Sequence, residues 1–178
     1  MEKKNISIKK CSIVLYTDGS VWGDGDHSST LNCIDLLSEL DLTNKKVLDI
    51  GTGTGILSIV SKELGAEEVV GIDTNPSAIG LAELNFRKND VSGTLHTILP
   101  GEIIDYKADI IVANLPPHMC EWYLIKMINF MGNDSKVIMT MPTRFDMEVA
   151  LNNSKCNLHI VKENVSNGYG AFLLESDV

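Results

Sequence analysis

The feature that most constrains this chain is an apolar run that ends in alternating glycines. Residues 46–50 (KVLDI) lead into 51–55 (GTGTG), and apolar residues at helical spacing begin at Ile56. A short run that is apolar on both faces is typical of a buried parallel strand, and glycine permits a tight turn from such a strand into a helix. The segment therefore predicts a strand, a glycine-rich turn and a helix closed by Gly65.

The same alternation of strands and helices continues along the chain. Strand-like runs occupy 69–73, 94–98, 108–114 and 136–141, and helix-like segments begin at Pro76 and cover 119–131 and 144–152. The last two runs, 158–161 and 171–174, are joined by a short turn and are expected to be antiparallel. We expect an α/β, Rossmann-like sandwich: a mostly parallel seven-stranded sheet with helices on both faces and an antiparallel last strand.

The segment before this core is expected to be an extension and not a further domain. Residues 6–16 have strand-like composition and 18–20 have the composition of a turn. A helix should follow, apolar at 31, 34, 37 and 40, with a serine or threonine of 28–30 as its N-cap. We expect residues 1–178 to form one domain, with 1–21 as its strand-like extension.

Composition and charge limit the partners. Fifteen Lys and Arg residues against 24 Asp and Glu residues give a net charge of -9, which repels phosphate backbones, so we expect no nucleic-acid partner. The four cysteines form no C-x-x-C pair, which predicts reduced thiols in a soluble, cytoplasmic protein and no metal site. No signal peptide and no membrane span are expected, because no apolar run is long enough.

The glycine spacing favours one nucleoside cofactor over another. A dinucleotide site has the pattern G-x-G-x-x-G, whereas Gly51, Gly53 and Gly55 form G-x-G-x-G after Asp49. S-adenosylmethionine (SAM) has no pyrophosphate; Asp49 suits its ammonium group and the loop amides suit its carboxylate. Asp73, at the end of the next strand, is placed to accept both ribose hydroxyls. The alternatives are a tight turn without a ligand and, for Asp73, a helix N-cap.

Residues 114–118 (NLPPH) follow another predicted strand at the same sheet edge. The prolines remove donors and leave carbonyl groups to accept hydrogen bonds, and the Asn114 amide both donates and accepts. This arrangement suits an amine acceptor or the amino-acid end of SAM; the alternative is a rigid turn. His27 and His118 are the nearest histidines, and a loop histidine is more often structural than a base. Trp22, Trp122 and Tyr123 either form a pocket wall or pack against their helix.

Residues 47–55 (VLDIGTGTG) resemble motif I of class I SAM-dependent methyltransferases. A closer resemblance is to the bacterial lysine methyltransferases that modify large-subunit ribosomal protein eleven. That family carries F-G-T-G-x-H-x-T-T before motif I; residues 22–30 (WGDGDHSST) keep both glycines, the histidine and the final threonine, with Trp in place of Phe. The family's A-N-I-L segment corresponds to 113–116 (ANLP). The resemblance runs from about Trp22 to Val137.

The resemblance implies that Thr30, Gly51, Asp73 and Asn114 contact SAM. Two departures limit what is carried over. The family has a separate N-terminal domain that presents its ribosomal substrate, whereas only residues 1–21 precede the glycine-rich stretch here. Residues 115–117 (LPP) are closer to the N-P-P-Y/F motif of methyltransferases that act on planar nitrogen, although Leu115 shifts the match.

Three hypotheses follow. The first is a SAM-dependent methyltransferase that acts on a nitrogen, or another nucleophile, of a small molecule or a protein side chain, with Asn114 and His118 as catalytic candidates. The second is a SAM-binding module without activity of its own that supports a partner subunit. The third, an NAD-dependent oxidoreductase, is disfavoured by the glycine spacing. The sequence leaves the acceptor and the oligomeric state open.

Overall fold

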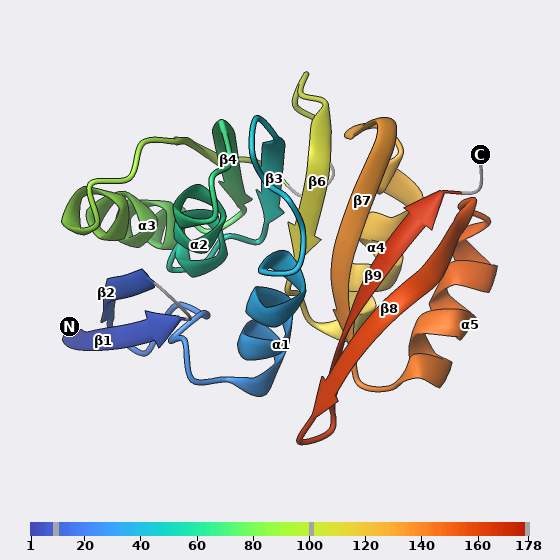
Figure 1. Ribbon diagram of the computed structural model, residues 1–178, viewed down its shortest axis with the longest axis horizontal. Helices are drawn as coiled ribbons and strands as arrows, with labels where there is room; N and C mark the ends of the chain where they lie inside the picture. Colours follow the sequence, from blue (N-terminus) through green and yellow to red (C-terminus); the bar gives the residue numbers. More distant parts are fainter. Residues whose placement is uncertain (9–10, 100–101, 177–178) are drawn as a thin grey trace.

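The computed structural model describes residues 1–8, 11–99 and 102–176, and from residue 46 onward its strands and helices follow one another in the predicted order (Figure 1). The strands are β1 (Glu2–Ile8), β2 (Cys11–Thr17), β3 (Lys46–Ile50), β4 (Glu68–Asp73), β5 (Thr94–Thr97), β6 (Ala108–Ala113), β7 (Met131–Met141), β8 (Leu158–Ser166) and β9 (Tyr169–Ser176). The helices are α1 (Ser28–Leu37), α2 (Ile56–Glu63), α3 (Pro76–Lys88), α4 (Pro117–Met127) and α5 (Arg144–Ser154).

A seven-stranded sheet organises the molecule, in the order β5-β4-β3-β6-β7-β9-β8. The neighbouring pairs β5–β4, β4–β3, β3–β6 and β6–β7 are parallel. Strand β9 lies between β7 and β8 and pairs antiparallel with both. The predicted fold class is therefore confirmed, including the antiparallel last strand. The chain runs outward from β3 to β4 and β5 and then returns to pair β6 with the other side of β3. The strand order reverses between β3 and β6, and such a switch point is where α/β sheets bind ligands.

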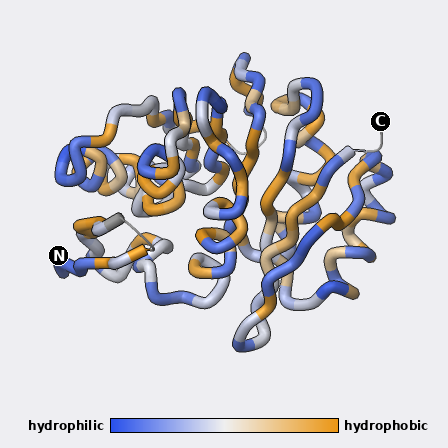
Figure 2. Tube along the Cα trace, viewed as in Figure 1, coloured by the Kyte–Doolittle hydropathy of each residue, from blue (hydrophilic) through white to orange (hydrophobic). Residues whose placement is uncertain are grey.

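The core consists of two apolar layers, one on each face of the sheet. In β3, Val47 belongs to the layer that includes α1 and α2, whereas Leu48 and Ile50 belong to the layer under α4 and α5. Alternate side chains of a strand point to opposite faces, so a strand covered on both sides is a continuous apolar run. Figure 2 shows this hydrophobic character along the central strands.

The N-terminal segment forms a separate two-stranded antiparallel sheet, the β1–β2 hairpin. The predicted run at 6–16 is thus two strands, and residues 9–10 between them lie outside the described residues. Apolar side chains on both strands made the run continuous in composition. Ile13 and Leu15 of β2 are buried in the same layer as α1 and α2, so the hairpin completes the core on that face (Figure 1).

Several element ends differ from the sequence prediction, among them those of α1, α4 and β7. The N-cap of α1 is His27, whose Nδ1 accepts a hydrogen bond from Ser29 N, so the predicted serine or threonine cap is wrong. Helix α4 ends at Met127 and not at 131, because Phe130 N turns back to Met127 O. Pairing with β6 then begins, where Ala108 N donates to Phe130 O, so β7 starts five residues before the predicted 136.

Candidate cofactor and acceptor site

Residues from separate segments meet at the carboxyl ends of β3, β4 and β6. Gly51 follows β3, Asp73 ends β4 and Asn114 follows β6. The parallel registers place Ile50 beside both Ile72 and Ala113, so the residues that follow these positions lie at one sheet edge. Gly51 and Asn114 flank the switch point between β3 and β6, where a ligand is expected.

The glycine loop is hydrogen-bonded to the end of β4. Gly51 N and Thr52 N donate to Ile72 O over 2.8 and 3.0 Å, and Gly53 N donates to Asp73 Oδ2 over 3.0 Å. These bonds hold the loop beside the partly exposed Asp73 carboxylate. The loop and the candidate ribose-binding residue are therefore one structural unit.

Two glycines of the loop lie where other backbone or side-chain atoms approach closely. A Cβ on Gly53 would lie 2.3 Å from the carbonyl oxygen of Trp22, and one on Gly51 would lie 2.2 Å from Cδ2 of Leu115. Both glycines also have positive φ angles, of 55° and 73°. The loop is thus enclosed by the glycine-rich stretch on one side and by the segment after β6 on the other.

Gly55 has a different surrounding from the other two glycines. It is the N-cap of α2 with φ of 84°, and a Cβ there would lie 3.1 Å from Ala82 Cβ and 3.1 Å from Phe86 Cε1 of α3. Close packing of α2 against α3 therefore accounts for this glycine. Its predicted contact with the cofactor stays a prediction.

Asp49 is buried beneath the loop, with 1% of its surface exposed. Its Oδ2 accepts hydrogen bonds from Thr52 Oγ1, Ser58 N and Ser58 Oγ, whereas Oδ1 is buried and has no partner among the described residues. Burial raises the pKa of Asp49 to about 6. A buried carboxylate oxygen without a partner is costly, so this atom fits a cationic ligand group such as the ammonium of SAM.

Asp73 does not cap α3, which excludes the alternative reading of this residue. The cap is Asn75, whose side chain accepts from Ser77 N over 2.9 Å. Asp73 Oδ1 accepts from Asn75 N, and Oδ2 accepts from Gly53 N. A carboxylate oxygen has further lone pairs, and the partly exposed position leaves them available to ribose hydroxyls at the sheet edge.

Asn114 is joined to α1 by a hydrogen bond from its Nδ2 to Thr30 Oγ1, over 3.0 Å. Thr30 is 1% exposed, and the two residues are 84 positions apart in the chain. The structure thus brings together two residues that the family resemblance implicates. The bond orients the Asn114 carboxamide.

The prolines after Asn114 do not leave the adjacent carbonyl groups free. Leu115 O accepts from Cys120 Sγ and Thr140 Oγ1, and Pro116 O accepts from Met119 N in the first turn of α4. The expectation that these two carbonyls remain for an acceptor is wrong, because they start α4 and join it to β7.

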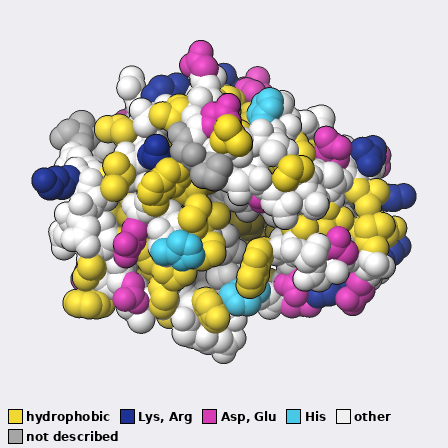
Figure 3. Space-filling view, turned by 180° about the vertical axis from the view of Figure 1, so that it is seen from behind, with side chains coloured by type: hydrophobic (Ala, Val, Ile, Leu, Met, Phe, Trp, Pro, Cys, Tyr) yellow, Lys and Arg dark blue, Asp and Glu magenta, His cyan; other side chains and the backbone are white. Residues whose placement is uncertain are grey.

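The candidate histidines lie on two different helices. His27 caps α1, and its ring meets that of Tyr169 edge-on, with centroids 4.4 Å apart. His118 is exposed in the first turn of α4. Figure 3 shows histidine and hydrophobic side chains around a hollow on the face of the molecule opposite to the view of Figure 1.

The aromatic residues divide between surface and core. Trp22 is 84% exposed, whereas Tyr123 is buried and packs edge-on against the half-buried Trp122. The Lys126 ammonium lies 4.6 Å from the Trp122 ring centroid, a cation–π contact. Helix packing therefore accounts for Tyr123, and Trp22 has the exposed position that a pocket wall needs.

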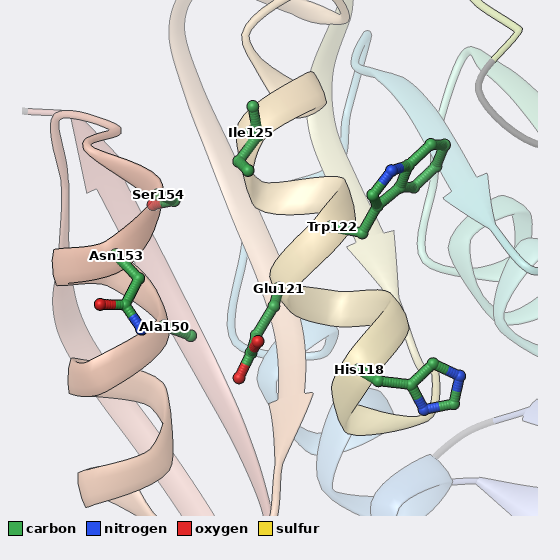
Figure 4. A pocket seen from close by; sticks show the side chains of 7 residues that line it. All are labelled: His118, Glu121, Trp122, Ile125, Ala150, Asn153 and Ser154. Atoms are coloured by element: carbon green, nitrogen blue, oxygen red, sulfur yellow. The ribbon is translucent and has the colours of Figure 1, made fainter.

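A cavity of about 260 Å³ lies between α4 and α5. It is lined by His118, Glu121, Trp122, Ile125, Ala150, Asn153 and Ser154, as Figure 4 shows. Glu121 and Ile125 lie on the side of α4 that faces α5, whereas His118 and Trp122 point to the other side. The cavity shares His118 with the candidate site but contains none of Gly51, Asp73 and Asn114.

Sequence reasoning missed two polar residues that shape the loop. Ser58 donates twice to Asp49 from the first turn of α2. Asn85 of α3 donates to Thr54 O over 2.8 Å and is fully buried. Both lie on the buried faces of amphipathic helices, and a polar residue at such a position was the available signal.

The sheet order and the helices on its two faces are those of the class I SAM-dependent methyltransferase fold. The model of the ribosomal protein L11 methyltransferase (PrmA) family matches residues 3–140. The chain belongs to this family, a family of SAM-dependent methyltransferases. Among curated relatives, the ribosomal protein L11 methyltransferases of Colwellia psychrerythraea and Tolumonas auensis are 41% and 43% identical over 102 and 103 residues.

These alignments cover 57% of this chain and 35% of each relative, so the chain spans about a third of the length of the curated relatives it matches. The crystal structure of the ribosomal protein L11 methylase from Lactobacillus delbrueckii subsp. bulgaricus is similar in fold, with a TM-score of 0.79, 24% identity and coverage of 90% of this chain and 83% of that one. A 16S rRNA methyltransferase of T. thermophilus, solved with AdoMet and guanosine, has a TM-score of 0.83 at 19% identity, over 99% of this chain and 50% of that one.

Among the helices of the described residues, none is both long and apolar enough to span a membrane.

Proposed function

We propose that this chain binds SAM at the carboxyl ends of β3, β4 and β6 and directs methyl transfer to a nitrogen of a protein side chain. The observation that supports it best is the buried Oδ1 of Asp49 beneath the glycine loop, which has no partner in the described part of the chain and suits the ammonium end of SAM. Family membership and the protein substrate named for the relatives support the class of acceptor.

Each predicted residue has a role in this proposal. Asp49 holds the ammonium of the amino-acid end, and Asp73 holds the ribose. The amides of Gly51 and Gly53 already donate to Ile72 O and Asp73 Oδ2, so the expectation that they bind the carboxylate is wrong; these glycines instead let the cofactor approach the loop backbone closely. Thr30 orients Asn114, which positions either the cofactor or the acceptor nitrogen beside it. Gly55 supports the loop from the start of α2.

When bound, SAM supplies a methyl group activated by its sulfonium centre. The chain therefore needs chiefly to align the acceptor nitrogen with that methyl group, and alignment alone supplies a large acceleration. A protonated amine must also lose a proton before it attacks, and His118, exposed at the start of α4, is the candidate to accept it.

Calorimetry with SAM, S-adenosylhomocysteine and NAD tests the cofactor. We expect the first two to bind and NAD not to bind; tight NAD binding without SAM binding would contradict the proposal.

Asp73→Ala should weaken SAM binding at least tenfold in a folded protein, because a charge-assisted hydrogen bond contributes about 1.5–3 kcal/mol.

Transfer of labelled methyl groups to candidate proteins, peptides and small amines tests the acceptor. Labelling of a protein side-chain nitrogen, such as that of lysine, would support the proposal, and labelling of a small amine alone would contradict the class of acceptor. SAM binding without turnover on any acceptor would instead identify a SAM-binding module that supports a partner subunit.

A further inference from the structure

The buried side chain of Asn85 connects the N-terminal hairpin to the glycine loop. Its Oδ1 accepts from Tyr16 N over 2.7 Å, and its Nδ2 donates to Tyr16 O over 3.1 Å and to Thr54 O over 2.8 Å. These bonds use both amide donors and the amide acceptor. Asn85 is 0% exposed, so a lost bond would not be replaced by bulk water.

Asn89, one helical turn later, binds the same strand but not the loop. Its Oδ1 accepts from Val14 N over 2.8 Å, and its Nδ2 donates to Val14 O and to Asn85 O. Asn89 is the C-cap of α3, so the two asparagines lie one turn apart at the end of that helix. Together they bond alternate residues on the edge of β2 that does not pair with β1.

Thr54 is the point at which three segments meet. Its N donates to Trp22 O over 3.0 Å, its Oγ1 donates to Gly23 O over 2.5 Å, and its carbonyl accepts from Asn85. The preceding residue, Gly53, is held by Asp73. The bond from Asn85 therefore acts on the loop immediately beside the candidate cofactor contacts.

The hairpin also supports the glycine-rich stretch directly. A Cβ on Gly25 would lie 2.1 Å from Ile6 Cδ1, so β1 packs closely against this stretch. Lys4 Nζ forms ion pairs with Asp26 over 2.7 Å and with Asp24 over 3.4 Å. The hairpin, residues 22–26 and the glycine loop are thus mutually packed.

We propose that Asn85 is a positioning residue for the cofactor, which couples the order of the β1–β2 hairpin to the glycine loop. Cofactor binding then stabilises the hairpin, and an intact hairpin strengthens cofactor binding, since coupling between two equilibria is reciprocal. This inference rests on the proposed SAM binding.

Asn85→Ala and Asn89→Ala are matched variants. Both remove hydrogen bonds to β2, but only Asn85→Ala also removes a hydrogen bond to the glycine loop. We expect Asn85→Ala to raise the Kd for SAM at least tenfold, equivalent to about 1.4 kcal/mol, and Asn89→Ala to raise it less than threefold at a similar loss of Tm. Equal changes in Kd would overturn the inference. Failure of the wild type to bind SAM would instead overturn the proposed function.

Hydrogen exchange on the wild type tests the coupling without a variant, in case Asn85→Ala does not fold. Saturating S-adenosylhomocysteine should slow exchange of the Tyr16 and Val14 amides, which are bonded to the two asparagines. Protection of the Gly53 and Thr54 amides with unchanged exchange in the hairpin would contradict the coupling.

Discussion

At the scale of single residues, the ionised form of Asp49 is expected to favour cofactor binding but to lower the stability of the fold. Its pKa is raised from 3.8 to about 6 by burial, and its Oδ1 has no partner among the described residues. Between about pH 4 and pH 6 the folded protein holds a proton that the unfolded chain has released. The free energy of unfolding therefore falls as pH rises through this window, by about 3 kcal/mol for this group.

Asp49→Asn should remove this penalty. We expect the free energy of unfolding at pH 7.5 to rise by about 1–3 kcal/mol, with little difference from the wild type at pH 4, while SAM affinity falls at least tenfold. Urea titrations across this pH range and calorimetry at pH 7.5 measure both effects. A variant that is less stable than the wild type at pH 7.5 would show that the ionised carboxylate stabilises the fold.

Asn114 and His118 are expected to contribute unequally to turnover. Asn114 is oriented by Thr30 across the switch point, whereas His118 is an exposed residue at the start of a helix. Because alignment matters most, Asn114→Ala should lower kcat by about a hundredfold and His118→Ala by less than tenfold. An inactive His118 variant beside a fully active Asn114 variant would reverse the two roles and identify His118 as the base.

At the scale of elements, the β8–β9 hairpin is anchored to the helix that carries Thr30. Asn32 of α1 is 5% exposed; its Nδ2 donates to Tyr169 O over 2.8 Å and its Oδ1 accepts from Ser166 Oγ over 2.9 Å. Figure 1 shows the turn of this hairpin beside α1, beyond the carboxyl ends of β6 and β7. The anchor therefore joins two elements that border the candidate site.

Asn32→Ala should destabilise the protein by about 1–3 kcal/mol, because it leaves buried partners unsatisfied. Asn167→Gly is the control: the Asn167 side chain is exposed and donates to Ser28 Oγ, and glycine tolerates the positive φ of 51° at this turn residue, so the substitution should change stability by less than about 0.5 kcal/mol. Urea unfolding curves give both values. Equal effects of the two substitutions would mean that the anchor does not depend on Asn32.

At the scale of the whole molecule, the net charge of -9 opposes contact with nucleic acid. Of the basic residues near the N-terminus, Lys4 is not free to contact nucleic acid, because it is paired with Asp24 and Asp26. Lys9 and Lys10 lie outside the described residues. We expect no binding of nonspecific RNA at physiological salt. Filter binding with sub-micromolar affinity would contradict this and direct attention to a nucleic-acid acceptor.

What the sequence determined by itself was the local pattern. The alternation of apolar strands and helices, the glycine turn after β3 and the positions of Asp73 and Asn114 at strand ends follow from side-chain periodicity and spacing, which short segments specify. These were sufficient to predict the fold class, and they place the candidate site at one edge of the sheet. The hairpin was only partly predicted, because its two strands share one composition.

What only the tertiary structure decided were the contacts between distant segments. The bond from Asn114 to Thr30 spans 84 positions, and those from Tyr16 and Val14 to Asn85 and Asn89 span 69 and 75. Such bonds form where packing brings two polar groups together away from water, and no local spacing encodes that meeting. For the same reason the burial that isolates Asp49 Oδ1, and with it the raised pKa, emerged only once α2 and the loop were in place.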